Sequence, residues 1–135
     1  MKMPNEQFIY KFQSNKIKGT TLPSSFLKSF INGISRIAKR INEISDFKSN
    51  EFDFNMEIKA GSVQICVSAF ENDPTGLKSL RKTSQIVGGF LEDTDTPYLA
   101  DSVIKRGLRE FVKSTSNYAD TLQVFRDGTR IGGTI

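Results

Sequence analysis

The sequence contains no histidine, and its 135 residues include one cysteine, Cys66. Without imidazole there can be no Ser-His-Asp triad, no Cys-His pair and no His-ligated zinc site. One cysteine excludes an internal disulfide and a cysteine-rich zinc site. The dipeptide Gly-Lys does not occur, so the chain has no phosphate-binding P-loop. These absences predict a protein that is not an enzyme and that binds no cofactor or metal ion.

Long hydrophobic runs are also missing. No segment approaches the roughly 18 apolar residues of a membrane span, and residues 1–6 lack the apolar core of a signal peptide. Hydrophobic residues make up 37% of the chain and charged residues 25%, which is typical of a globular protein. We therefore expect a cytoplasmic protein that forms a single α+β domain over residues 1–135 and does not contact a membrane.

The clearest pattern is a stripe of apolar residues spaced three and four apart. The stripe consists of Leu27, Phe30, Ile31, Ile34, Ile37, Ala38, Ile41 and Ile44. It predicts an amphipathic helix over residues 25–45, and weaker stripes predict helices over 75–92 and 102–117. Gly88 and Gly89 interrupt the second of these helices and indicate a kink, a close helix contact or an early end.

Alternating apolar residues predict strands over residues 7–13, 52–59, 63–70 and 122–125. The order β-α-β-β-α-α-β predicts an antiparallel sheet with helices on one face, either ferredoxin-like (split βαβ) or a variant with an extra helix. Asp127 and Gly128 are a hairpin signal, so residues 129–131 can pair back on the last strand. Alternatively, residues 127–135 form a flexible tail or the start of a truncated segment.

Four consecutive residues, Glu92-Asp93-Thr94-Asp95, are the strongest candidate for a metal site, because hard cations prefer clustered carboxylates. The segment that starts at Asp93 does not match the pattern of a calcium-binding loop. Its sixth position is Tyr98 in place of glycine, and its twelfth is Ile104 in place of glutamate. We interpret it as a solvated loop before the third helix.

Basic residues form stripes on two of the predicted helices. They are Lys28, Arg36, Lys39 and Arg40 on the first helix, and Lys105, Arg106, Arg109 and Lys113 on the third. Such residues can contact phosphate groups, which makes nucleic acid one candidate partner. The alternative is an ordinary solvated surface, because a net charge of +4 alone says little about partners.

The first half of the chain carries one family resemblance. A strand, the segment Gly19-Thr20-Thr21-Leu22-Pro23, a long amphipathic helix and a strand broken at Gly61-Ser62 follow one another over about residues 8–70. This order resembles the start of uncharacterised bacterial and phage-associated proteins. The resemblance implies a non-enzymatic module, either whole or as the N-terminal part of a longer chain, and it transfers no functional residue.

The sequence therefore predicts a protein-binding module that contacts another protein and self-associates as a homo-oligomer. Three amphipathic helices share a sheet of about four short strands, so apolar surface is left over for a partner. The alternative hypothesis is a nucleic-acid-binding or regulatory protein that uses the basic helix faces.

Overall fold

The computed structural model describes residues 7–14, 17, 24–45, 52–59, 61–69, 74–92 and 100–133. In chain order its elements are β1 (Gln7–Gln13), α1 (Ser24–Ser45), β2 (Phe52–Lys59), β3 (Ser62–Ala69), α2 (Pro74–Leu91), α3 (Ser102–Ser116), β4 (Thr121–Arg126) and β5 (Thr129–Gly133). The predicted α+β class and the antiparallel sheet are confirmed. Within the described ranges, no helix is long and apolar enough to cross a membrane.

The predicted element order is wrong at its end, because a fifth strand follows β4. The strands lie in the order β2-β3-β1-β4-β5. Asp127 and Gly128 turn the chain with positive φ angles of 47° and 87°, as a tight hairpin requires. Of the two alternatives for this segment, the hairpin is confirmed, and residues 129–133 form a strand and not a flexible tail. The predicted element order omits β5 because the strand ends in Gly132 and Gly133, and glycine is rare in strands.

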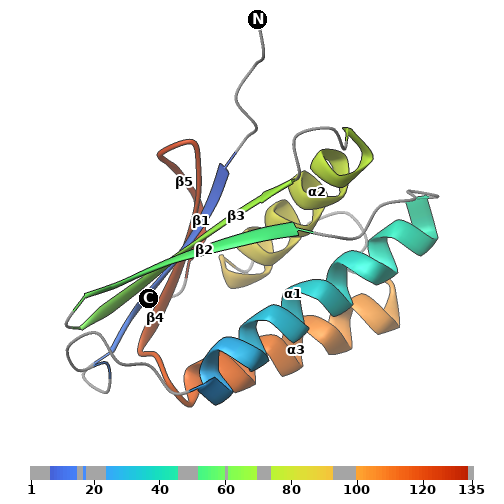
Figure 1. Ribbon diagram of the computed structural model, residues 1–135. Helices are drawn as coiled ribbons and strands as arrows, with labels where there is room; N and C mark the ends of the chain where they lie inside the picture. Colours follow the sequence, from blue (N-terminus) through green and yellow to red (C-terminus); the bar gives the residue numbers. More distant parts are fainter. Residues whose placement is uncertain are drawn as a thin grey trace, which may run out of the picture.

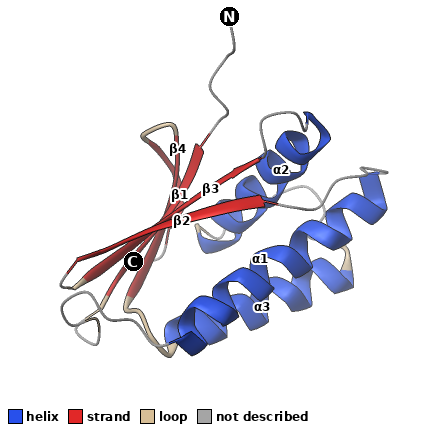
Figure 2. Ribbon diagram, in the orientation of Figure 1, coloured by secondary structure: helices blue, strands red, loops and turns tan. Residues whose placement is uncertain are grey.

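Three aromatic residues of β1 form the centre of the core. Phe8, Tyr10 and Phe12 are fully buried, as their alternation predicts. The Tyr10 ring packs against Phe30 of α1 with 5.2 Å between ring centroids, and its hydroxyl group lies 2.8 Å from the Ser84 hydroxyl of α2. Because Tyr10 reaches both helices, α1 and α2 cover the same face of the sheet (Figures 1 and 2). Burial raises the pKa of the Tyr10 hydroxyl, so the two hydroxyl groups form a neutral hydrogen bond.

The third helix packs mainly on α1, beside which it runs in Figure 1. Two glycines allow the close approach: a Cβ atom at Gly33 would lie 2.5 Å from Cδ2 of Phe111, and one at Gly107 would lie 3.3 Å from Cγ1 of Ile37. Packing on a helix explains how three amphipathic helices fit over one small sheet.

Gly88 and Gly89 neither end nor break α2, which continues to Leu91. Of the three predicted alternatives, the structure shows the close contact, and the neighbour is a strand. A Cβ atom at Gly132 of β5 would lie 2.1 Å from the carbonyl oxygen of Gly88. The backbones of α2 and β5 therefore touch where both elements have glycine.

Candidate interaction surfaces

The face of the sheet opposite α1 and α2 carries a different set of side chains. Alternation along β1 and β3 directs Ile9, Lys11, Gln64 and Cys66 away from the buried aromatic residues. All four are partly exposed. We call this surface the open face, and no helix of the described part of the chain covers it (Figure 1).

An apolar row crosses the open face. The strand register places Ile9 of β1 directly opposite Cys66 of β3 on one side and Phe125 of β4 on the other. These three partly exposed residues are the apolar row. Its neighbours on the same face include the uncharged Gln7, Asn55, Gln64, Ser68 and Gln123 and the charged Lys11, Asp53 and Glu57, and Arg130 of β5 stands opposite Phe125. Neither Ile9 nor Phe125 is among the predicted site residues, although Ile9 is an apolar residue on the outward side of an alternating strand.

Cys66 is the one nucleophile in the apolar row, and its surroundings lower the reactivity of its thiol. Burial raises the pKa of the Cys66 thiol, and the negative charge of Asp53 on the neighbouring strand raises it further. The thiolate is the reactive form of cysteine, so a raised pKa lowers reactivity at neutral pH. The row is therefore suited to contact and poorly suited to covalent chemistry.

This pKa shift gives a testable prediction. Replacing Asp53 by asparagine removes the smaller of the two causes, so the pKa of Cys66 falls but stays above its ordinary value. We expect alkylation of the variant by iodoacetamide to be faster at a given pH, with the rate profile shifted toward lower pH. Glu57→Gln, a neutralisation on the same strand, is the matched control and should leave the profile unchanged. An unchanged profile in Asp53→Asn would show that Asp53 does not act on the thiol.

The basic residues of α1 are partly engaged within the protein. Arg36 forms an ion pair with Glu110 of α3. Arg40 binds Asp101, with 2.9 Å between Nη2 and Oδ2, and also Glu43. Asp101 is the N-cap of α3, and the hydrogen bond from Arg40 is the main reason why its pKa is lowered. Arg36 and Arg40 thus join α1 to α3. Lys28 and Lys39, the other two predicted site residues on α1, are exposed.

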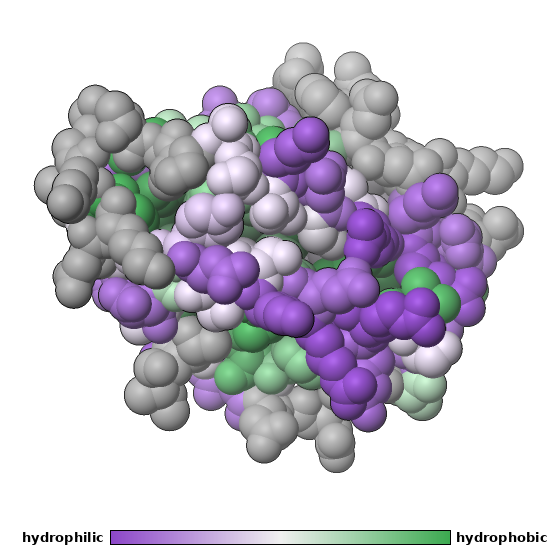
Figure 3. Space-filling view, turned by 90° about the horizontal axis from the view of Figure 1, so that it is seen from below, coloured by the Kyte–Doolittle hydropathy of each residue, from purple (hydrophilic) through white to green (hydrophobic). Residues whose placement is uncertain are grey.

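The four basic residues of α3 form a separate stripe. Because each helical residue turns about 100°, Lys105, Arg109, Lys113 and Arg106 lie within an arc of about 100°. All four are exposed, and none forms an ion pair with another residue in the described ranges. We call them the α3 stripe. Seen from the side on which α1 and α3 lie, the molecule presents mainly hydrophilic residues (Figure 3).

A groove of about 190 Å³ lies along the line of contact between α1 and α3. Its walls include Ser29, Asn32, Ser114 and the Arg36–Glu110 pair. The two charged groups neutralise each other, and the remaining polar groups are amides and hydroxyls. The groove therefore offers neither a nucleophile with an adjacent base nor a set of metal ligands.

The predicted acidic loop is only partly described. Glu92 forms an ion pair with Arg130 of β5, 3.0 Å apart, whereas Asp93 and Asp95 lie outside the described residues. In the described part of the chain, no three His, Cys, Asp or Glu side chains come together to hold a metal ion. Glu92 thus joins the end of α2 to the β5 edge.

No family model matches the chain, and no curated protein or solved structure matches it either. A function is therefore inferred from the chemistry of these surfaces.

Proposed function

We propose that this chain is a non-catalytic protein-binding module that docks a partner protein on the open face of its sheet. The observation that carries the proposal is the apolar row of Phe125, Ile9 and Cys66, which lies across three adjacent strands. Protein interfaces commonly have an apolar centre within a polar rim, and the glutamines and serine around the row supply such a rim.

The order of the strands supports a ferredoxin-like assignment for the scaffold. β3 lies between β1 and β2 and is antiparallel to both, a feature that the split βαβ plan requires and that supports the assignment. We assign α3 and β5 as additions to that plan. In this arrangement, the helices cover one face, and the other face stays accessible to a partner.

The chemistry of the row supports binding over catalysis. Acyl or group transfer by a thiol needs a lowered pKa and an adjacent base. Burial and the charge of Asp53 both raise the pKa of the Cys66 thiol. With no histidine in the sequence, the commonest general base is also missing.

The experiment that tests the proposal places a charge in the middle of the row. The wild-type chain and Ile9→Lys are immobilised and exposed to an extract of cells that make the protein, and retained proteins are identified by mass spectrometry. We expect the variant to retain the partner at least about tenfold less, because its charged lysine would be desolvated at the apolar centre of the interface. Lys11→Gln, on the same face, is the control and should retain it. Equal retention by wild type and Ile9→Lys would overturn the proposal, provided that both melt at similar temperatures.

The α3 stripe supports nucleic-acid binding as a second function. Its four cations are exposed and have no ion-pair partner in the described ranges, so they can neutralise phosphates. This function predicts binding to single- or double-stranded DNA or RNA that weakens steeply from 50 to 200 mM salt. Changing Lys105, Arg109 and Lys113 to glutamine should reduce the slope of log K against log salt by about 3, whereas Lys59→Gln should not. Absence of binding at low salt would exclude this function.

A further inference from the structure

The edge of the sheet at β2 is available for pairing. β2 is the last strand in the sheet order, and none of the described strands pairs with its outer side. Five of its eight side chains are exposed: Asp53, Asn55, Met56, Glu57 and Lys59. Edge strands are commonly protected by charged side chains, which prevent a second chain from adding to the sheet. On β2 the charges have both signs, and their positions determine which pairing they would oppose.

Hydrogen bonds on the other side of the hairpin show which backbone groups of β2 point outward. The amide of Ser14 donates to the carbonyl oxygen of Gly61 at 3.0 Å. Because the direction of the backbone groups alternates along a strand, the N–H and C=O groups of the odd-numbered residues of β3 point toward β1. The backbone groups of the even-numbered residues of β3 therefore point toward β2, where they pair with the backbone of Asp53, Asn55, Glu57 and Lys59. The N–H and C=O groups left for the outer edge belong to Phe52, Phe54, Met56 and Ile58.

This alternation limits how two copies can pair through β2. Two antiparallel β2 strands form backbone hydrogen bonds only when residues whose N–H and C=O groups point outward stand opposite each other. Three two-fold registers with substantial overlap satisfy this rule, and they are centred on Asn55, Met56 or Glu57.

The charges discriminate among the three registers. Centring on Asn55 places Asp53 opposite Glu57 of the other copy, twice, and centring on Glu57 places that carboxylate opposite itself. Like charges directly opposite each other destabilise a sheet. Centring on Met56 places Asp53 opposite Lys59, twice, so that both pairs attract. The register centred on Met56 is the one that the charges favour.

The helix side of the strand favours the same register. Met56 is 39% exposed and would meet its own copy at the two-fold axis. Phe54 and Ile58, both partly buried, would stand opposite each other across the edge. Apolar pairs directly opposite on one face stabilise antiparallel strands.

We propose that the partner of the β2 edge is a second copy of this chain, paired antiparallel about a two-fold axis at Met56 so that one sheet runs through both copies. This inference rests on the proposed function, because it specifies self-association as one of the contacts of the module. It uses the edge of the sheet, whereas the apolar row lies on the open face.

A cysteine scan tests the register. In a Cys66→Ser background, single cysteines replace Asn55, Met56 or Glu57, and each variant is oxidised at a concentration where the chain is dimeric. Directly opposite residues in a hydrogen-bonded pair have Cα atoms about 5.5 Å apart, which a disulfide can span. We expect Met56→Cys to form a covalent dimer and the other two variants to remain largely monomeric on non-reducing gels. Crosslinking at position 55 or 57 in preference to 56 would overturn the proposed register.

Charge exchange provides a second, independent measurement. Asp53→Lys and Lys59→Asp each place two like-charged pairs in the interface, and each should weaken dimerisation at least about tenfold in sedimentation velocity. The double variant restores both attractions and should dimerise like the wild type. Lys11→Gln on β1, two strands away from the β2 edge, is the control and should change little.

The outcomes separate this inference from the proposed function. A wild-type chain that stays monomeric up to millimolar concentration, or a double variant that does not recover, overturns edge pairing. Neither result bears on the Ile9→Lys experiment. Ile9→Lys should leave the Met56→Cys crosslink intact, because Ile9 lies two strands away from the β2 edge.

Discussion

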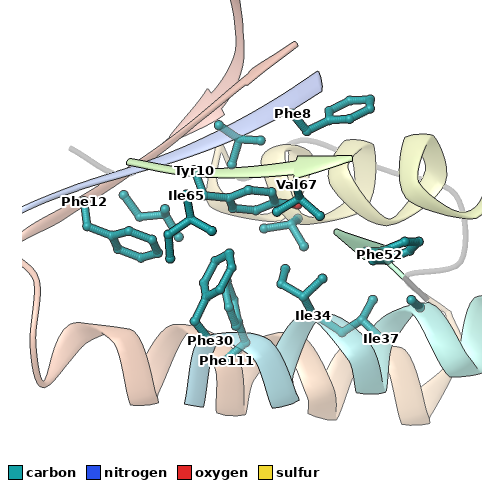
Figure 4. Packing of buried hydrophobic residues seen from close by; sticks show 14 of the residues in the cluster. Phe8, Tyr10, Phe12, Phe30, Ile34, Ile37, Phe52, Ile65, Val67 and Phe111 are labelled. Atoms are coloured by element: carbon teal, nitrogen blue, oxygen red, sulfur yellow. The ribbon is translucent and has the colours of Figure 1, made fainter. Parts of the chain in front are cut away.

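Replacing Phe30 by alanine is expected to lower the free energy of unfolding by about 3–5 kcal/mol, the typical cost of removing a buried phenylalanine. Phe30 is fully buried and forms edge-to-face contacts with Tyr10, Phe12 and Phe54 at centroid distances of 5.2, 5.5 and 6.2 Å. Its ring also packs against Phe111 of α3 at 5.8 Å. Figure 4 shows Phe30 beside Phe111, with both rings directed toward the strands.

The size of the effect follows from the position of the ring between layers. The cavity would open where α1, α3 and the sheet meet, and the surrounding elements cannot close around it without losing contacts of their own. Since natural domains have a total stability of about 5–15 kcal/mol, the loss is a large share of the whole.

Urea denaturation followed by circular dichroism measures this prediction. Val103→Ala is the control, because Val103 is 45% exposed on α3 and its truncation should cost less than about 0.5 kcal/mol. A loss below about 1 kcal/mol in Phe30→Ala would contradict the packing described for α1.

Replacing Gly132 by alanine is the second large effect that we expect. The added Cβ atom would lie 2.1 Å from the Gly88 carbonyl oxygen, 2.4 Å from its carbon and 2.5 Å from its Cα atom. All three are backbone atoms of α2, so no side chain can rotate away to make room. Either β5 or α2 must move, and the Ile131 side chain near Gly88 must move with them.

The cost should reach about 3 kcal/mol, the upper end of the usual range for overpacking. For a domain of this size, such a loss lowers the melting temperature by about 10 °C. Hydrogen exchange should speed up in β5 and in the second half of α2 before it does so in β1.

The control for this variant is Gly107→Ala, where the added Cβ atom would lie 3.3 Å from one side-chain atom, Cγ1 of the buried Ile37, and would meet no backbone atom of another element. Calorimetry should show a clearly smaller decrease in melting temperature for Gly107→Ala than for Gly132→Ala. Equal melting temperatures for the two variants would mean that β5 does not dock on α2 as described.

Periodicity predicted much of the fold. The apolar stripe identified α1 correctly, and Phe30, Ile34, Ile37, Ala38 and Ile41 are all buried. The same stripe misplaced Ile44, which is 40% exposed near the end of the helix, and omitted Phe26, which is buried. Spacing alone gives the direction of a side chain and not how far the neighbouring layer extends.

The candidate sites were harder to predict, because each depends on what lies opposite. Arg36 and Arg40 are basic residues of a predicted exposed face, but α3 supplies Glu110 and Asp101 as their partners. Met56 belongs to an alternating strand whose apolar residues are predicted to be buried. It is exposed because β2 is an edge strand, and no sequence pattern reports the position of a strand in its sheet.

The sequence by itself determined the three helices, the first four strands, the side of β1 that faces the core and the missing imidazole chemistry, because these depend on residue type and local spacing. The tertiary structure alone decided the row of Phe125, Ile9 and Cys66, the free edge at β2 and the contact between Gly88 and Gly132. Each of these brings together residues far apart in the chain. Their proximity depends on the strand order and on the packing of whole elements, which short-range patterns do not encode.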